Sequence, residues 1–214
     1  MSARAHILDA VRTALKDSPA VPDIPRGYRT AVELGADDLT HILVDRLEDY
    51  KAGVTVVAEA DVPATIQGLL ADAATYVVPA GLEPGWLAWE TDPARIKYDG
   101  GAHGARSVAE LDAIGAVVTS SAVTVAESGT IILDGSPDQG RRAISLIPDH
   151  HVCVVHSRDI TAILPEALRR LDGTRPLTMI SGPSATSDIE LERVEGVHGP
   201  RRLDVIVVRQ GYVR

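Results

Sequence analysis

The sequence predicts an α/β domain, with a mixed, largely parallel sheet, flanking helices and an N-terminal helical appendage. Short β-branched runs alternate along the chain with segments of helical periodicity, as in α/β proteins. The chain has no Phe and only 2 Trp, so Val, Ile, Leu and Ala must build its core, which suits buried parallel strands. Closely spaced β-branched runs within 116–134 indicate that part of the sheet is antiparallel.

The first 29 residues are expected to lie outside the sheet. A helix over 4–17 is indicated by apolar residues at helical spacing, namely Ile7, Leu8, Val11 and Leu15. We expect this helix to pack on the domain as an appendage, with docking on another subunit as the alternative. Three prolines within 19–28 then predict an extended linker. The chain therefore divides into a helix with a Pro-rich linker (1–29) and an α/β domain (30–214).

Helices and strands are expected to alternate through the domain. The expected helices cover 37–51, 61–74, 107–114, 140–147 and 159–172. The expected strands cover 54–58, 75–80, 115–120, 151–156, 176–180 and 203–208, with a hairpin over 121–134. Asp61 is a suitable N-cap for its helix, and Pro63 suits the first turn. The segment with Trp86 and Trp89 is expected in the core, with a partner surface as the alternative.

Charge and motif content exclude several classes of protein. The net charge of −9 lacks the basic footprint of a nucleic-acid binder. No run approaches the roughly 18 apolar residues of a membrane helix, and the charged N-terminal pattern does not resemble a signal peptide. We therefore expect a cytoplasmic protein without a membrane span. The phosphate loops G-x-G-x-x-G (after the first strand) and G-x-x-x-x-G-K-[ST] are absent, which argues against nicotinamide, flavin and P-loop sites.

Cys153 is the only cysteine of the chain. A disulfide within the chain and a four-cysteine iron–sulfur cluster are therefore excluded. Its setting, HHVCVVH, predicts a buried strand and an apolar environment for the thiol. His150, His151 and His156 flank it, but strand alternation sends neighbouring side chains to opposite faces. We expect no metal and no cofactor.

The segment AESGTIIL (126–133) offers the first candidate for chemistry. Glu127 lies on an expected turn, where its carboxylate can act as base or nucleophile. Ser128 and Thr130 add hydroxyls, and Gly129 allows a ligand to approach the backbone closely. The alternative is a hairpin turn with a solvated glutamate.

The segment GPSATSDIE (182–190) is the second candidate. Free backbone N–H groups in such a loop, after Gly182, can hold a phosphate or carboxylate, helped by Ser184 and Thr186. Asp188 and Glu190 would repel an anion and would instead bind hydroxyls or hold the loop in shape. The alternative is that these residues only shape the loop.

The segment EGVHGPRR (195–202) is the third candidate. His198, preceding Gly199, can serve as a donor or general acid/base, and Arg201 or Arg202 can supply charge for an anion. The same G-x-H-G-x-R spacing occurs at 101–106, either by coincidence or because both loops face one site. A triad of Ser184, His198 and Asp188 lacks the G-x-S-x-G motif that would support a hydrolase.

Three stretches, AESGTIIL, SLIPDHHVCVV and SGPSATSDIELERVEGVHGPRRLDVIVV, resemble the lactate-utilization (LUD) domain family over roughly residues 30–210. AESGT stands where the family has AETGT, a change that keeps the glutamate and the glycine. The resemblance implies a fold like that of glucosamine-6-phosphate deaminase, ribose-5-phosphate isomerase and the CoA-transferases. CoA-transferases carry a glutamate nucleophile followed closely by glycine in a turn, and Glu127-Ser128-Gly129 resembles that arrangement.

The resemblance also implies a component of an L-lactate oxidation system, converting lactate to pyruvate, whose other members carry iron–sulfur clusters. With one cysteine this chain would be a cluster-free subunit that binds iron–sulfur partner proteins and a small anionic metabolite. The alternative is a free-standing isomerase or acyl/CoA-transferase-like enzyme that acts on a sugar phosphate or acyl thioester through Glu127. We expect one pocket at the strand ends, lined by Glu127, Gly129, Ser184, Thr186, Asp188, His198 and Gly199.

Overall fold

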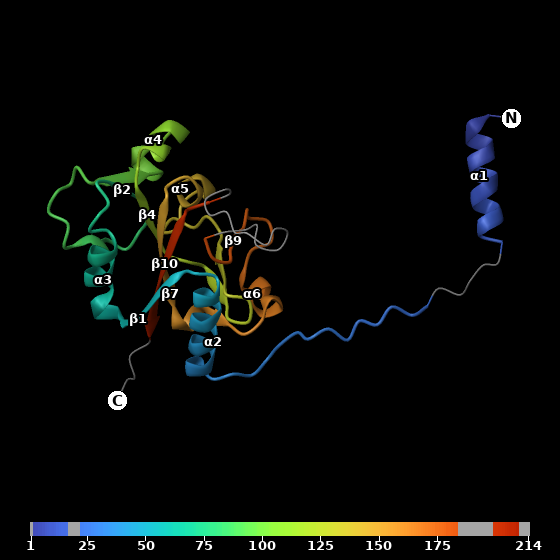
Figure 1. Ribbon diagram of the computed structural model, residues 1–214, viewed down its shortest axis with the longest axis horizontal. Helices are drawn as coiled ribbons and strands as arrows, with labels where there is room; N and C mark the ends of the chain where they lie inside the picture. Colours follow the sequence, from blue (N-terminus) through green and yellow to red (C-terminus); the bar gives the residue numbers. More distant parts are fainter. Residues whose placement is uncertain (1, 17–21, 184–198, 210–214) are drawn as a thin grey trace.

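The structure is a computed structural model that describes residues 2–16, 22–183 and 199–209 (Figure 1). Within these residues the main sheet has six parallel strands in the order β1-β10-β7-β4-β2-β3. In that order the strands are Gly53–Ala58, Arg202–Arg209, His150–His156, Ala116–Thr119, Tyr76–Pro79 and Ile96–Asp99. The α/β class expected from the sequence is confirmed.

A second sheet of four short strands lies against the first, in the order β8-β5-β6-β9. These strands are Ile160–Thr161, Val123–Val125, Thr130–Leu133 and Thr178–Ile180. The β5–β6 and β6–β9 pairs are antiparallel, and the β5–β8 pair is parallel. The expectation of one mixed sheet is therefore wrong. The hairpin forms a sheet of its own because a parallel neighbour of β4 would need a crossover of about a dozen residues, which the short connection to β5 does not provide.

Helices and short 3-10 segments connect the strands. The α-helices are α1 Ala3–Ala14, α2 Ala36–Asp49, α3 Val62–Leu69, α4 Val108–Asp112, α5 Arg142–Leu146 and α6 Leu164–Arg170. The 3-10 segments are η1 Glu59–Asp61, η2 Pro84–Leu87, η3 Gly101–His103 and η4 Ser157–Asp159.

Two expected helix starts need correction. The helix expected over 159–172 begins at Leu164, since Pro165 fits only the first turn of a helix, and Ile160–Thr161 pairs as β8 instead. Asp61 stands just before α3, but its side chain makes no capping hydrogen bond because its backbone is already helical, at the end of η1. The short strand β3 was not expected at all.

Side-chain alternation divides the core between the two faces of the main sheet. On one face, Val152 and Val154 of β7 pack with strand neighbours against α3 and the η2 segment. On the other face, Cys153 and Val155 pack against α2 and the second sheet. Trp86 is 6% exposed within the first cluster, so its expected place in the core is confirmed.

Cys153 is fully buried, as its strand setting predicts. Burial raises the pKa of its thiol to about 12, only partly opposed by the hydrogen bond from Thr119. The thiolate is therefore not populated near neutral pH, and Cys153 serves packing rather than nucleophilic chemistry.

Helix α1 is amphipathic but buries none of its residues, and Figure 1 draws it apart from both sheets. Its apolar side chains remain exposed, with Ile7 at 62% and Val11 at 48%. The expected packing of α1 on the domain is therefore wrong, and residues 22–34, which include Pro22 and Pro25, connect it in an extended conformation. In the part of the chain that is described, no helix is long and apolar enough to cross a membrane.

His151 provides a test of this core through pH. Its Nε2 lies 2.8 Å from the Thr119 hydroxyl, and its Nδ1 is buried without a partner among the described residues. Burial, with a smaller effect of His150, lowers the pKa of His151 to about 3. Below about pH 6.5, the unfolded chain therefore binds a proton at His151 that the folded chain does not bind.

We predict that the free energy of unfolding falls as pH drops from about 6.5 towards 3, with a His151 contribution of up to about 1.4 kcal/mol per pH unit. His151→Gln should flatten this dependence in urea unfolding at a series of pH values. The control is His41→Gln, which removes an exposed histidine of α2 and should leave the slope unchanged. Equal slopes for wild type and His151→Gln would contradict the assignment.

Candidate functional site

Glu127 lies on the turn between β5 and β6, as expected. Its side chain is 53% exposed, and its Oε1 accepts a hydrogen bond of 2.8 Å from Arg29 of the linker. Gly129 has a φ of +60°, and a Cβ there would lie 3.0 Å from the Cβ of Arg46. The turn is thus pressed against α2, while the Glu127 carboxylate faces solvent and the linker.

A chain of hydroxyls joins this turn to the segment that follows β9. Ser128 Oγ lies 2.8 Å from Thr130 Oγ1, which lies 2.8 Å from Ser181 Oγ. Gly182 comes next, with a φ of +80°, and a Cβ there would lie 2.6 Å from the Cβ of Tyr50 at the end of α2. The hydroxyl chain therefore joins the first candidate segment to Ser181, the residue just before the second candidate segment.

The rest of the expected pocket is only partly described. Five candidates lie outside the described residues, namely Ser184, Thr186, Asp188, Glu190 and His198. Gly199 lies near Leu146 of α5, and Arg201 makes an ion pair of 3.6 Å with Asp149, in which both side chains are more than 60% exposed. The convergence of all candidates in one pocket stays a prediction.

The three histidines around Cys153 have three different partners. His150 Nε2 lies 2.7 Å from Asp204, and His156 Nδ1 lies 3.6 Å from Glu59, while His151 contacts Thr119. Strand alternation separates His150 from His151, as expected, whereas His150 and His156 share a face at opposite ends of β7. Among the described residues, no three His, Cys, Asp or Glu side chains are grouped so that they could hold a metal ion.

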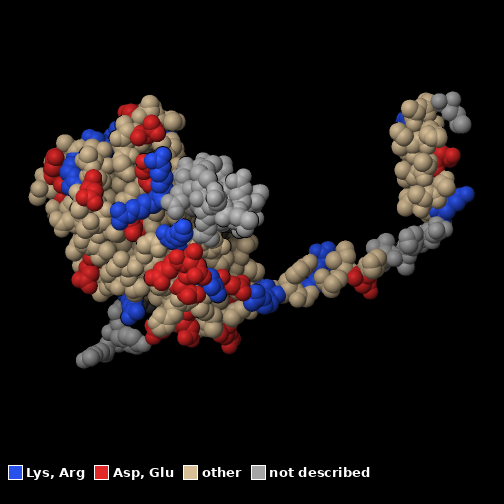
Figure 2. Space-filling view, in the orientation of Figure 1, with Lys and Arg blue, Asp and Glu red and all other residues tan. Residues whose placement is uncertain are grey.

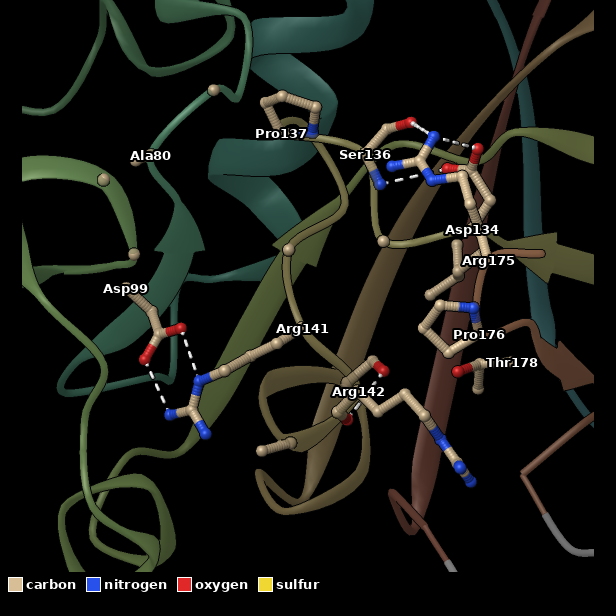
Figure 3. Close-up of a pocket in the computed structure, with 18 residues that line it drawn as sticks. Ala80, Asp99, Asp134, Ser136, Pro137, Arg141, Arg142, Arg175, Pro176 and Thr178 are labelled. Carbon is tan, nitrogen blue, oxygen red and sulfur yellow. Dashed lines mark hydrogen bonds and ion pairs between the residues drawn. The ribbon is translucent and has the colours of Figure 1, made fainter. Parts of the chain in front are cut away.

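A cavity of about 830 Å³ opens where the carboxyl ends of β2 and β3 meet the second sheet (Figure 3). We call it the arginine pocket and define it by its charged lining residues, Asp99, Asp134, Arg141, Arg142 and Arg175, and by Thr178. Asp99 ends β3, Asp134 follows β6, and Thr178 begins β9. The pocket therefore lies at the seam between the two sheets, at the strand ends where α/β proteins bind ligands.

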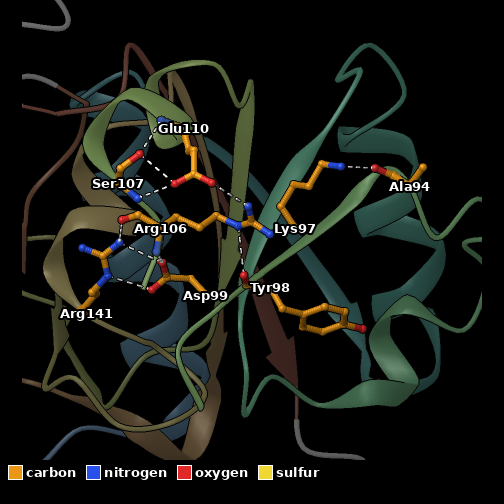
Figure 4. Close-up of polar contacts among 8 residues, drawn as sticks. All are labelled: Ala94, Lys97, Tyr98, Asp99, Arg106, Ser107, Glu110 and Arg141. Carbon is orange, nitrogen blue, oxygen red and sulfur yellow. Dashed lines mark hydrogen bonds and ion pairs between the residues drawn. The ribbon is translucent and has the colours of Figure 1, made fainter. Parts of the chain in front are cut away.

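Asp99 is the most buried charged group of this pocket, at 3% exposure. Its carboxylate accepts two hydrogen bonds from the Arg141 guanidinium, at 2.8 and 2.9 Å, and one of 2.8 Å from the backbone N–H of Arg106 (Figure 4). Burial alone would raise the pKa of Asp99, but the bonds from Arg141 and Arg106 outweigh it and lower the pKa. Asp99 is therefore ionised and fixes the orientation of Arg141.

A second carboxylate holds a second arginine across the pocket. Arg175 Nη1 lies 2.8 Å from Asp134 Oδ2 and 3.2 Å from Ser136 Oγ. Asp134 Oδ1 also accepts a 3.0 Å bond from the Ser136 N–H, and its own N–H donates to Gln139 at 2.7 Å. The side chain of Arg142 makes no hydrogen bond or ion pair with any described residue.

The charge of the arginine pocket differs from that of the chain. Its lining carries three guanidinium groups against two carboxylates, in a chain with a net charge of −9. Figure 2 shows acidic side chains gathered over α2. The arrangement can therefore bind a carboxylate or phosphate, because guanidinium groups match both in geometry.

A smaller cavity, of about 380 Å³, borders the arginine pocket at Gly81. We call it the acidic cavity; Glu59, Glu83, Asp138 and Asp159 are its carboxylates. Ser120 at the end of β4 donates a hydrogen bond to Asp138. Neither cavity is lined by Glu127.

Sequence reasoning missed the arginine pocket. A signal was available, because Asp99 and Asp134 are each followed by glycine, in YDGG and LDGS, and Asp134 ends a short apolar run. The arginines gave no such signal, since Arg175 lies in an irregular segment far from Arg141 and Arg142 in sequence.

The described residues define an α/β protein with an anion-compatible pocket at the carboxyl ends of parallel strands. Comparison then assigns the family: the LUD domain model matches residues 40–208, so the chain belongs to that family, and the resemblance noted in the sequence is confirmed. The chain is 43% identical over 210 residues to lactate utilization protein C of Deinococcus radiodurans, covering 96% of this chain and 95% of that protein.

Two further comparisons agree with this family. Lactate utilization protein C of Bacillus subtilis is 31% identical over 132 residues, covering 58% of this chain and 51% of that protein. A crystal structure of a DUF162 family protein from Deinococcus radiodurans, at 1.70 Å resolution, matches with a TM-score of 0.69 and 41% identity, covering 82% of this chain and 99% of that chain.

We predict that Asp99→Asn destabilises the protein by about 2 kcal/mol, because it removes the charge that holds Arg141 in a partly buried pair. Urea unfolding at pH 7 measures this. The difference from wild type should shrink as pH falls through the lowered folded-state pKa of Asp99, where protonation ends the pairing.

Asp45→Asn is the matched control, since Asp45 pairs with Arg46 on the exposed surface of α2 and should cost less than about 0.5 kcal/mol. If both variants lose equally little stability, the Asp99 pair does not organise the pocket.

Proposed function

We propose that this chain is a cytoplasmic, cluster-free component of a lactate-utilization system, which binds a small anionic ligand and works with iron–sulfur partner proteins. The observation that carries the proposal is the 43% identity to lactate utilization protein C over 95% of that protein. With a single, fully buried cysteine, the chain cannot supply the thiolates of a cluster, so any redox centre would come from a partner.

The arginine pocket is the site that best supports anion binding. Arg141 and Arg175 are held in place by Asp99 and Asp134, so little side-chain entropy remains to be lost when a ligand binds. Arg142 is exposed and has no described partner, which leaves its guanidinium free to bind an anion.

The alternative is a free-standing isomerase or acyl/CoA-transferase-like enzyme that uses Glu127. The exposure of this carboxylate and the adjacent Ser128 and Thr130 hydroxyls support it. A reacting Glu127 would first have to give up its ion pair with Arg29, and it lines neither cavity, so we rank this function second. The finer fold assignment on which it rests also stays a prediction.

Thermal unfolding with lactate, pyruvate, sugar phosphates and acyl-CoAs separates the two functions. A ligand at 100 times its Kd stabilises the native state by about 2.7 kcal/mol, which raises the Tm by several degrees. We predict that at least one anion raises the Tm, and that Arg142→Gln reduces the shift while Glu127→Gln and the control Arg12→Gln retain it. A shift lost in Glu127→Gln instead would favour the alternative, and no shift with any compound would contradict the anion site.

Helix α1 is the element that we propose for contact with an iron–sulfur partner. Its apolar stripe contains Ile7 and Val11 and continues to Leu15, the residue just after the helix, and all three are exposed. An exposed apolar stripe on a helix is typical of a segment that seats in a groove of another protein. Arg4 and Arg12 against Asp9 give the helix a basic character, which would suit carboxylates around such a groove.

We predict that Ile7→Glu combined with Val11→Glu abolishes copurification with iron–sulfur proteins of the same cell and growth on lactate. The Tm should change little, because α1 buries no residue on the domain. Thr13→Glu adds one negative charge, half of that in the double variant, on the opposite face of α1 and should preserve both properties. Unchanged copurification of the double variant would remove α1 from the interface.

A further inference from the structure

The volume of the arginine pocket bears on the size of its ligand. At about 830 Å³, it falls within the roughly 300–1,000 Å³ of cavities that hold drug-sized ligands and cofactors. A three-carbon acid such as lactate or pyruvate would fill only a small part of this space. Water would occupy the remainder, and most of the pocket surface would make no contact with the ligand.

The charges of the pocket favour more than one anionic group on the ligand. Both carboxylates are already engaged: Asp99 accepts three hydrogen bonds, and Asp134 accepts bonds from Arg175 and Ser136. Their role is to hold arginines rather than to repel a ligand. Figure 3 shows the guanidinium groups of Arg141, Arg142 and Arg175 spread along the pocket, so linked phosphates, which offer several acceptor oxygens, can reach more of them than a single carboxylate can.

The remaining lining of the arginine pocket is mostly apolar. Besides Ser136, Ser145 and several glycines, it comes from the apolar side chains of Ala80, Leu133, Pro137, Ala143 and Pro176. These side chains offer no hydrogen bonds, so they suit a flat or aliphatic group carried by the same ligand. A suitable ligand therefore combines linked phosphates with an apolar body of coenzyme size.

The acidic cavity adds acceptors for a hydroxylated part of such a ligand. It borders the arginine pocket at Gly81, and the loop between β6 and α5 contributes Pro137 to one cavity and Asp138 to the other. Carboxylates are the groups that hydrogen-bond the hydroxyls of ribose in nucleotide sites. Anionic phosphates would remain with the arginines, because the acidic cavity repels them.

We infer that the arginine pocket binds a nucleoside phosphate of coenzyme size, with linked phosphates, rather than lactate itself. This inference rests on the anion site of the proposed function and narrows its ligand class. Side-chain guanidinium groups would take the place of the glycine-rich phosphate loops that the sequence lacks. Two sources share this chemistry, a free adenine nucleotide and coenzyme A or its thioesters.

Isothermal titration of the full chain tests the inference with five probes: ADP, coenzyme A, pyrophosphate, adenosine and lactate. We expect ADP or coenzyme A to bind at least about tenfold more tightly than pyrophosphate, adenosine or lactate. The reason is that, of the five probes, only ADP and coenzyme A combine linked phosphates with an apolar body. Whichever of ADP and coenzyme A binds more tightly identifies the source of the ligand. Arg142→Gln should weaken the tighter ligand about tenfold or more through loss of a charged hydrogen bond, and Arg12→Gln should not weaken it.

Three results would overturn the inference. Pyrophosphate or lactate binding as tightly as ADP and coenzyme A would mean that only charge is recognised. Adenosine binding equally tightly would mean that the arginines play no part. Absence of binding by both ADP and coenzyme A would exclude the ligand class. If lactate raises the Tm in an Arg142-dependent way while neither nucleotide binds, the proposed function survives and only this inference fails.

Discussion

The fold depends on the need to cover a parallel sheet on both faces. The central strands β7 and β10 direct apolar side chains to both sides, and Val152, Cys153, Val154 and Val155 are all fully buried. Parallel sheets are stable only when both faces are covered. Helix α3 and the η2 segment cover one face, and α2 with the second sheet covers much of the other. The second sheet is therefore part of the core rather than an addition to it.

The same covering arrangement creates the arginine pocket. Because β6 and β9 lie beside the main sheet, Asp134 and Thr178 face the end of β3, where Asp99 lies. A carboxylate as buried as Asp99 would destabilise the fold by several kcal/mol without a partner. Its two bonds from Arg141 and one from Arg106 offset that cost and give the guanidinium one orientation. The pocket is thus organised before any ligand arrives.

Local patterns predicted local structure better than they predicted the site. The β5–β6 hairpin, the buried Cys153 and the core position of Trp86 follow from β-branched runs and apolar neighbours. The division of the strands into two sheets could not be predicted from such local patterns, because it depends on which strands pair over long sequence distances. The pair of Asp99 with Arg141 joins residues 42 positions apart, and no spacing rule connects them. The Ser128 and Thr130 hydroxyls could be predicted as site residues because they are close to Glu127 in sequence. Their partner Ser181 could not be predicted, because it lies 51 residues beyond Thr130.

The Glu127 turn and the arginine pocket lie at opposite ends of β6. Thr130, beside the turn, begins the strand, and Asp134 follows its last residue, so about 13 Å of extended chain separates them. The antiparallel register agrees, since Leu133 pairs with Thr178 at the pocket end and Ile131 with Ile180 near the hydroxyl chain. A ligand as small as lactate cannot contact both ends. Glu127 chemistry and anion binding by the arginines are therefore separate hypotheses, and only a ligand of coenzyme length could connect them.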